Sequence, residues 1–243
     1  MPTESGDMKL LGNFRSLIDH VSAEPDYNPS NPGLTKSALE SLYTAAQAAV
    51  AEVATKIAPH KVAINERQTG FEDLPRRVGN SFRMVKASGA DKKIRDDLET
   101  SRRKLSSKRK SKAVKDDPNT PKDEAAATHS ASQMSYDNQV GNLQSYVALL
   151  SNIASYQPNE NELKVSSLQA LTLDLKARND AVIATFVPLG QARGKRDQLL
   201  YAADGSVVNT ALGVKAYVSA AFGTNSQLNK QVKGIKFDRK RRV

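Results

Sequence analysis

Residues 35–58 read TKSALESLYTAAQAAVAEVATKIA, and their pattern is the first evidence for the architecture of this chain. Apolar side chains recur there at intervals of three and four residues, which places them on one face of an α-helix. The recurring residues are Leu39, Leu42, Ala46, Ala49, Val53 and Ile57. The stretch therefore predicts one long helix with a single buried stripe.

A related pattern returns 129 residues further on, near residues 164–187. There the apolar positions are Leu168, Leu171, Leu175, Val182 and Phe186, interrupted by Arg178. When residues 12–87 are set against residues 141–216 without a gap, 20 of the 76 positions are identical. Unrelated sequences would give about 5 identities. The chain is therefore predicted to contain two tandem copies of one unit.

Each copy is expected to begin with a short helix, near residues 8–22 and 133–155, followed by a turn and the long helix. Pro59 and Pro188 are expected to end or kink the long helix, because proline lacks the N–H group and clashes with the preceding turn. A second helix would then run to about Gly70 and Ala203.

A third helix is expected next in each copy. Asp73 and Ser206 are predicted to be its N-caps, and Gly89 and Gly223 suit its C-terminal end. Asp204-Gly205 is typical of a hairpin turn, but the equivalent place in the first copy is not. A hairpin is rejected because both copies should share one fold. A last basic helix or tail closes each copy.

The predicted fold class is all-α, with two tandem copies of a helical unit packed as a pseudo-twofold helical bundle. The first repeat, with its basic end, is placed at residues 8–112 and a flexible linker at 113–132. The second repeat is placed at 133–237 and a basic tail at 238–243. Whether the repeats make one bundle or two stays open.

Tyr27-Asn28-Pro29-Ser30-Asn31-Pro32, with Leu34-Thr35 and Leu39, has a degenerate copy around Tyr156. On these motifs the chain resembles uncharacterised, internally duplicated helical proteins of Bacteroidetes. The resemblance covers most of the chain apart from the linker. It implies a helical duplication and carries no function, site or cofactor. The repeated Tyr-x-Pro is expected to form a turn in which the tyrosine ring packs against the next helix.

Composition limits the chemistry that the chain can perform. The chain has 243 residues and no cysteine, which excludes disulfides, thiolate metal sites and cysteine nucleophiles. Neither a signal peptide nor an apolar run long enough to cross a bilayer is apparent. A cytoplasmic location is therefore expected, with no membrane span.

The net charge of +10 is concentrated in two short segments. Residues 101–115 carry +8 and residues 230–243 carry +6, so the rest of the chain sums to −4. Such clusters neutralise phosphates and bind polyanions in a salt-dependent way. The predicted polyanion-binding residues are Arg102, Arg103, Lys104, Lys108, Arg109, Lys110, Lys112, Lys236, Arg239, Lys240, Arg241 and Arg242. A solvated tail, or docking on an acidic protein patch, is the alternative.

Three polar residue types occupy equivalent positions in both copies. These pairs are Arg67 with Arg196, Asn80 with Asn209, and Lys86 with Lys215. They are interpreted either as a paired binding surface or, by preference, as structural residues that hydrogen-bond buried groups and join helices.

No other motif predicts a catalytic, metal or cofactor site. Residues 190–196 approach a phosphate-binding loop but are one residue short and follow no strand. The three histidines do not pair at helical spacing. No subset of Asp, Glu, Lys or Ser indicates a catalytic site. No cofactor and no small-molecule ligand are therefore predicted.

The preferred interpretation is a non-enzymatic structural or interaction protein that assembles with itself or with a larger complex and docks through its basic ends. A protein partner or self-association is expected. The alternative is a nucleic-acid-binding protein without sequence preference. An enzyme with a site between the copies is the least favoured reading.

Overall fold

The computed structural model describes residues 4–106 and 134–237, and this part of the chain contains helices and no strand. The elements are α1 (Glu4–Ser22), η1 (Pro32–Leu34), α2 (Lys36–Glu72), α3 (Leu74–Ala87), α4 (Lys92–Leu105), α5 (Tyr136–Ser151), η2 (Asn161–Leu163), α6 (Val165–Tyr201), α7 (Val207–Phe222) and α8 (Gln227–Gly234). The prediction of an all-α fold is therefore confirmed. No helix in the described ranges is long and apolar enough to cross a membrane.

The helices α2 and α6 are each 37 residues long, which corresponds to about 55 Å of helix. Pro59 lies inside α2 and Pro188 lies inside α6. Of the two expected effects, an end or a kink, the end is wrong, because the separate second helix expected after each proline is part of the same long helix. The kink stays a prediction. A proline in a helix interior costs one backbone hydrogen bond, and both helices continue past this loss.

The chain divides into two compact units, and α2 and α6 each contribute to both. Unit 1 contains residues Met1–Lys61 and Thr185–Val243, and unit 2 contains residues Val62–Ala184. The described helices of unit 1 are α1, the first part of α2, the last part of α6, α7 and α8. Unit 2 contains the end of α2, α3, α4, α5 and the first part of α6. The compact units do not coincide with the predicted repeats, residues 8–112 and 133–237, because each unit contains about half of each repeat. The bounds of the repeats therefore stay predictions.

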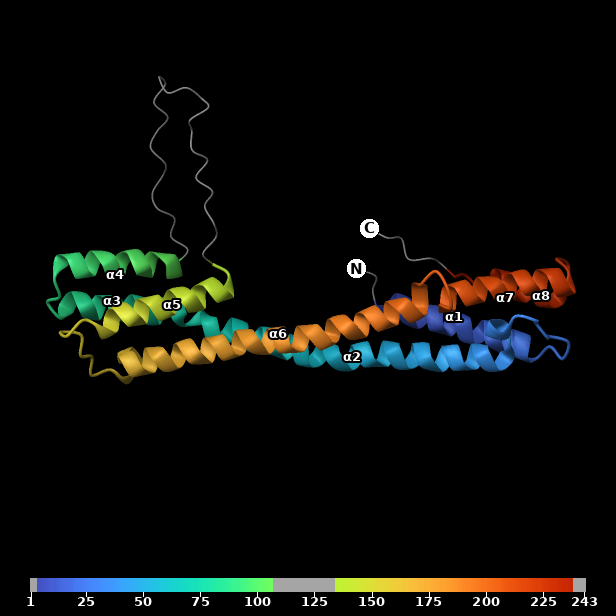
Figure 1. Ribbon diagram of the computed structural model, residues 1–243, viewed down its shortest axis with the longest axis horizontal. Helices are drawn as coiled ribbons and strands as arrows, with labels where there is room; N and C mark the ends of the chain where they lie inside the picture. Colours follow the sequence, from blue (N-terminus) through green and yellow to red (C-terminus); the bar gives the residue numbers. More distant parts are fainter. Residues whose placement is uncertain (1–3, 107–133, 238–243) are drawn as a thin grey trace, which may run out of the picture. The chain divides into compact units, whose positions relative to one another are not determined.

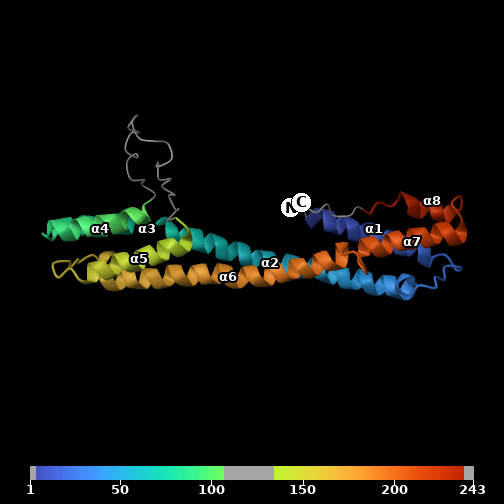
Figure 2. The same cartoon turned by 45° about the horizontal axis from the view of Figure 1, so that its top comes forward.

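The core of unit 1 joins the beginning of the chain to its end. Helix α1 packs against α7 and α8, as Figures 1 and 2 both show. Phe14, Leu17 and Ile18 of α1 are fully buried, together with Val214 and Val218 of α7. The burial of these apolar side chains is the main source of stability for such helices.

Unit 2 is organised in the same way. Helix α5 packs against α4, and α3 lies beside α4 (Figure 1). Leu143 and Tyr146 of α5 are fully buried among Leu74, Val85 and other side chains of α3 and α4. The Tyr146 hydroxyl is 2.8 Å from Ser81 Oγ in this core. The helix before η2 thus packs against helices that lie more than 30 residues earlier in the chain.

The two tyrosines of the Tyr-x-Pro motif have matching environments. The Tyr27 hydroxyl donates a hydrogen bond to the Leu34 carbonyl oxygen at 2.8 Å, and Tyr156 does the same to Leu163 at 2.6 Å. Both tyrosines are buried. At both places a tyrosine hydroxyl therefore closes the turn before the long helix, while the expected packing of the ring against that helix stays a prediction.

The predicted helix ends are partly correct. Ser206 accepts a hydrogen bond from the backbone N–H of Asn209 and is the N-cap of α7, as predicted. Gly89 and Gly223 have φ angles of +75° and +83°, which glycine adopts without strain. Asp73 occupies the N-cap position of α3, as predicted, and its carbonyl oxygen accepts a hydrogen bond from the Arg77 N–H, but its side chain makes no capping hydrogen bond. Its carboxylate is used by two arginines instead.

Candidate functional site

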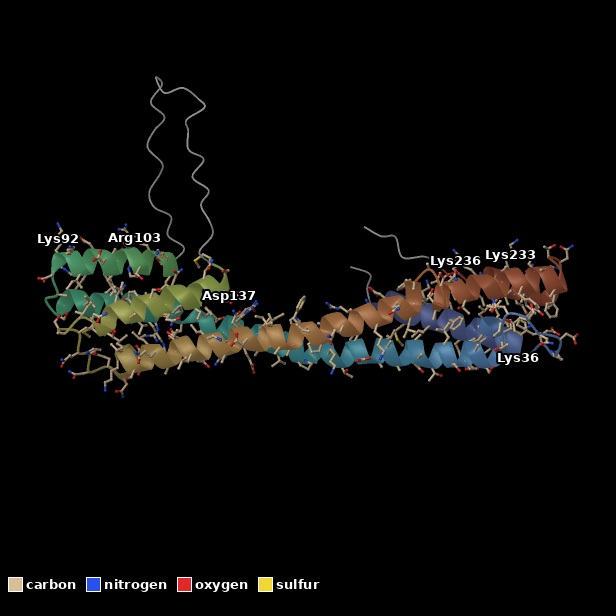
Figure 3. The ribbon with its side chains drawn as sticks, viewed as in Figure 1. Lys36, Lys92, Arg103, Asp137, Lys233 and Lys236 are labelled. Carbon is tan, nitrogen blue, oxygen red and sulfur yellow. The ribbon has the colours of Figure 1, made fainter. Side chains whose placement is uncertain are left out.

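The described part of the predicted polyanion-binding set lies on α4 and just after α8. Arg102, Arg103 and Lys104 form the last turn of α4, and Lys236 follows the end of α8 (Figure 3). The other predicted residues, Lys108, Arg109, Lys110, Lys112, Arg239, Lys240, Arg241 and Arg242, lie outside the described residues. The described residues are thus divided between unit 2 and unit 1.

Helix α3 is basic throughout its length. It carries Arg76, Arg77, Arg83 and Lys86 and no acidic residue. Together with α4, residues 74–105 contain ten Lys and Arg residues against four Asp and Glu residues, so this hairpin carries +6. We call residues 74–105 the basic hairpin. It is the most strongly charged part of the described chain and the best candidate for a functional surface.

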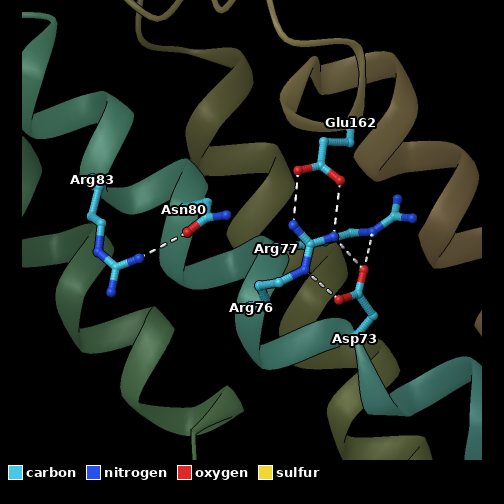
Figure 4. A network of polar contacts seen from close by, with 6 residues as sticks. All are labelled: Asp73, Arg76, Arg77, Asn80, Arg83 and Glu162. Carbon is cyan, nitrogen blue, oxygen red and sulfur yellow. Dashed lines mark hydrogen bonds and ion pairs between the residues drawn. The ribbon is translucent and has the colours of Figure 1, made fainter.

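Part of this charge is compensated by a polar network at the start of α3 (Figure 4). Arg76 Nε lies 2.5 Å from Asp73 Oδ1, and Arg76 Nη2 lies 2.9 Å from Glu162 Oε2. Arg77 Nε lies 2.9 Å from Asp73 Oδ2. Hydrogen bonds from both arginines lower the pKa of the Asp73 carboxyl to about 2. Arg76 thus joins α3 to η2, whereas Arg77 pairs with Asp73 directly before its own helix.

A second part of the charge is compensated on α4. Arg102 donates to both carboxylate oxygens of Glu99, at 2.8 and 2.7 Å, and Arg103 donates to the same residue at 3.3 Å. These hydrogen bonds hold the pKa of Glu99 below its usual value. Arg83 donates to Asn80 Oδ1 at 2.8 Å, which leaves its charge unpaired by this contact (Figure 4). The basic hairpin therefore keeps a positive excess.

A cavity of about 400 Å³ opens between α3 and α4. Four cationic side chains line it, Lys86 from α3 and Lys92, Arg95 and Arg103 from α4. Asp96, Glu99 and Phe82 complete the lining. Sequence reasoning missed this cavity because it depends on how two helices pack, although the basic character of both helices is visible in the sequence.

The repeated arginines occupy comparable positions in the two units. Arg196 is buried and its Nη1 lies 3.2 Å from Asp7 Oδ2, at the first turns of α1. Arg67 lies over the Tyr136 ring, 4.1 Å from its centroid, at the start of α5, and donates to Asn179 Oδ1. Asn179 in turn donates to Asp137. Each arginine thus joins a long helix to the first turn or turns of a shorter one, which fits the structural reading of this pair.

The other repeated residues differ more between the units. Asn80 lies in the middle of α3, whereas Asn209 lies in the first turn of α7, where its backbone N–H is capped by Ser206. Lys215 donates to the carbonyl oxygens of Lys233 and Ile235, and burial lowers its pKa. Lys86 is exposed and lies 4.7 Å from the Phe82 ring centroid. One member of every repeated pair lies in each unit.

Unit 1 has a cavity of its own, of about 540 Å³, between α1 and the segment after α8. Its charged lining residues are Lys9 and Lys236, and Asn13 donates to the Lys236 carbonyl oxygen at 2.9 Å. Tyr201, which also lines it, donates to Asp7 at 2.6 Å. This cavity has fewer cationic side chains than the one in the basic hairpin, two against four.

Two further motifs can be located. Gly190 and Gly194 lie inside the continuous helix α6, so residues 190–196 do not form a phosphate-binding loop. Among the described residues, no group of three or more His, Cys, Asp and Glu side chains could hold a metal ion.

Comparisons with models of protein families, with curated proteins and with solved structures gave no match for this chain.

Proposed function

We propose that this protein is a non-enzymatic interaction protein with an internally duplicated helical body, which docks on a larger assembly through its basic ends. The observation that carries the proposal is the basic hairpin of residues 74–105 in unit 2, with an excess of +6. The chain continues from α4 into further lysines and arginines. Charge of this density favours binding to an acidic partner.

The matched features of the two units support an internal duplication. Each unit combines the first half of one proposed repeat with the second half of the other. Each repeat has one closing tyrosine and one long helix with an interior proline. The two long helices, α2 and α6, have equal lengths. Because the halves are exchanged in the same way in both units, a pseudo-twofold body is the simplest interpretation. Such a body suits a structural or assembly role.

Binding to nucleic acid without sequence preference is a second candidate. It is favoured by the absence of acidic residues within α3 and by the three consecutive cations at the end of α4. The phosphodiester backbone of a nucleic acid binds such surfaces chiefly through charge, and the affinity then falls steeply with rising salt concentration. Self-association without any polyanion is the competing outcome.

Sedimentation of the purified protein over a range of concentrations tests these roles. The measurement is made at two salt concentrations, with and without a short DNA duplex. An oligomer that forms with rising protein concentration and does not bind the duplex favours the assembly role. A species that binds the duplex at low salt and releases it at high salt favours nucleic-acid binding. A monomer that binds neither itself nor the duplex contradicts both.

A further inference from the structure

The cavity of the basic hairpin is formed by two stripes of side chains that face each other. On α4, Lys92, Asp96, Glu99 and Arg103 follow one another at spacings of three and four residues, so they share one helix face. On α3 the facing stripe consists of Phe82 and Lys86. The cavity volume of about 400 Å³ lies within the range of small-molecule sites in proteins, about 300–1,000 Å³.

The cations of this cavity outnumber its carboxylates. The four cationic side chains face two acids, and both oxygens of Glu99 already accept hydrogen bonds from arginines. Asp96 is exposed, and unlike Glu99 it forms no side-chain ion pair with the described residues. The cavity therefore presents a net positive charge to any ligand that enters it.

Arg95 adds an unsatisfied donor. Its Nε atom is buried and has no hydrogen-bond partner among the described residues. A buried donor without an acceptor is unfavourable, and nearly all such groups in native proteins are paired. An anion bound in the cavity would supply acceptor atoms beside the Arg95 side chain.

The aromatic residue of the cavity does not offer a stacking surface. Phe82 is buried, and the Lys86 Nζ and Arg102 Cζ atoms lie 4.7 and 5.0 Å from its ring centroid. A base or another flat ring therefore has no free aromatic face to stack on. Recognition in this cavity must depend on charge and hydrogen bonding.

We propose that the cavity between α3 and α4 binds a phosphate group. This inference rests on the proposed docking role of the basic hairpin and names the chemical group that the hairpin recognises. A phosphate monoester carries about −1.5 to −2 charges and three strong acceptor oxygens, and a backbone phosphate carries one negative charge. Cations that reach in from two helices suit such a tetrahedral group, whereas a carboxylate has two coplanar oxygens that a single arginine satisfies. The phosphate belongs either to a small phosphorylated compound or to a nucleic-acid backbone.

Titration of the full chain with inorganic phosphate tests the proposal directly. We expect phosphate to shift the backbone amide resonances of α3 and α4, with a dissociation constant obtained from the same titration. The variant Lys92→Gln should weaken binding about tenfold, because it removes one charged donor from the cavity. Lys92 is exposed, so its loss should leave the fold intact. Circular dichroism checks this.

Lys93→Gln is the matched control. Lys93 is the next residue on α4, it is also exposed, and it does not line the cavity. The control should change phosphate affinity by less than about twofold. Asp96→Asn should strengthen binding, because it removes the exposed carboxylate from the lining. Equal weakening by Lys92→Gln and Lys93→Gln, or no phosphate-dependent shift at α3 and α4, would overturn the proposal.

A short DNA duplex in a parallel titration separates this inference from the docking role. Duplex binding that is weakened equally by both lysine variants, without phosphate binding, would retain the docking role and reject the cavity. Phosphate binding that is weakened by Lys92→Gln and not by Lys93→Gln, in a protein that binds neither the duplex nor a protein partner, would support the cavity and reject the docking role. A duplex that displaces phosphate and depends on Lys92 identifies a nucleic-acid backbone as the source. Phosphate binding unaffected by the duplex identifies a small phosphorylated compound.

Discussion

Arg196 and Asp7 form a buried ion pair between residues 189 positions apart in the chain. Arg196 Nη1 lies 3.2 Å from Asp7 Oδ2, and the side chains are 9% and 2% exposed. Tyr201 donates a further hydrogen bond to Asp7, and Arg196 also contacts Asp197. The pair fixes the first turns of α1 to the last part of α6 within unit 1.

Removal of Asp7 should strongly destabilise unit 1. Breaking a buried ion pair leaves an uncompensated charge and typically costs about 3–5 kcal/mol. We expect Asp7→Ala to lower the free energy of unfolding by about 3 kcal/mol, measured by urea denaturation followed by circular dichroism. The control is Asp19→Ala on the same helix, whose pair with Arg15 is 57% and 41% exposed. The control should cost at most about 1 kcal/mol. Equal effects of the two variants would contradict the structural importance of the buried pair.

The closing tyrosines should make the protein less stable in alkali. Burial raises the pKa of Tyr27 and of Tyr156 to about 12. Because the folded pKa lies above the ordinary value of 10.0, the neutral hydroxyls stabilise the fold fully below pH 10. This contribution is lost as the pH rises from 10 towards 12.

The measurement is the free energy of unfolding from pH 9 to pH 12, with the tyrosine absorbance recorded in parallel. The double variant Tyr27→Phe, Tyr156→Phe should lose about 1 kcal/mol per hydrogen bond at pH 8. It should also show a shallower decline of stability above pH 10 than the unmodified chain. A decline of the same steepness in both proteins would show that other groups govern the alkaline limit.

Asp73 should remain ionised in acid well below the usual range of aspartate. Its pKa of about 2 results from hydrogen bonds donated by Arg76 and Arg77. A lowered folded pKa means that the stabilising contribution is present above the ordinary pKa of 3.8 and is lost as the pH falls towards 2. Carbon-detected NMR titration of the carboxyl group measures this value.

The matched variants replace one arginine at a time. Arg77→Gln should raise the pKa of Asp73 by less than Arg76→Gln, because the hydrogen bond from Arg76 is the larger cause of the shift. Arg76→Gln should also release Glu162, whose pKa is lowered chiefly by the same arginine. An Asp73 pKa near 4 in the unmodified chain would contradict the network in Figure 4.

The exchange of halves predicts that a chain cut between the proposed repeats stays assembled. Each unit draws helices from both sides of residues 107–133. We expect a protease site inserted after Asp117 to give, on cleavage, two fragments that sediment together with unchanged helicity. Fragments separated in denaturant should have much lower helicity alone, because α1 and α5 would lose the helices that cover their buried faces. A stable, fully helical monomer of either fragment would contradict the exchange.

Local features of the fold were predictable from the sequence because their causes are local. The stripe from Leu39 to Ile57 indicated α2, Ser206 indicated the start of α7, and Gly89 and Gly223 indicated helix ends. Each follows from periodicity or from the backbone preference of one residue. Asp73 indicated the start of α3 in the same way, but its side chain makes no capping hydrogen bond because its carboxylate pairs with Arg76 and Arg77.

The candidate site was only partly predictable for the same reason. The sequence shows a run of positive charge at Arg102, Arg103 and Lys104. The cavity lined by Lys86, Lys92 and Arg95 forms only when α3 and α4 pack together. Likewise Arg67 and Arg196 stood out by their repetition. Their partners, Tyr136 and Asp7, lie at positions 129 residues apart but use different chemistry, a ring face in one unit and a carboxylate in the other. A search for repeated residues could not find them.

The sequence alone determined that the described part of the chain is helical, where α3 and α7 begin and end, and where positive charge is concentrated. Only the tertiary structure decided that α2 and α6 continue through Pro59 and Pro188, and that α1 packs on α7 and α8 while α5 packs on α4. The physical reason is that an apolar stripe specifies burial without specifying a partner. When two halves of similar pattern can each cover the same stripe, the choice rests on the packing of the whole chain.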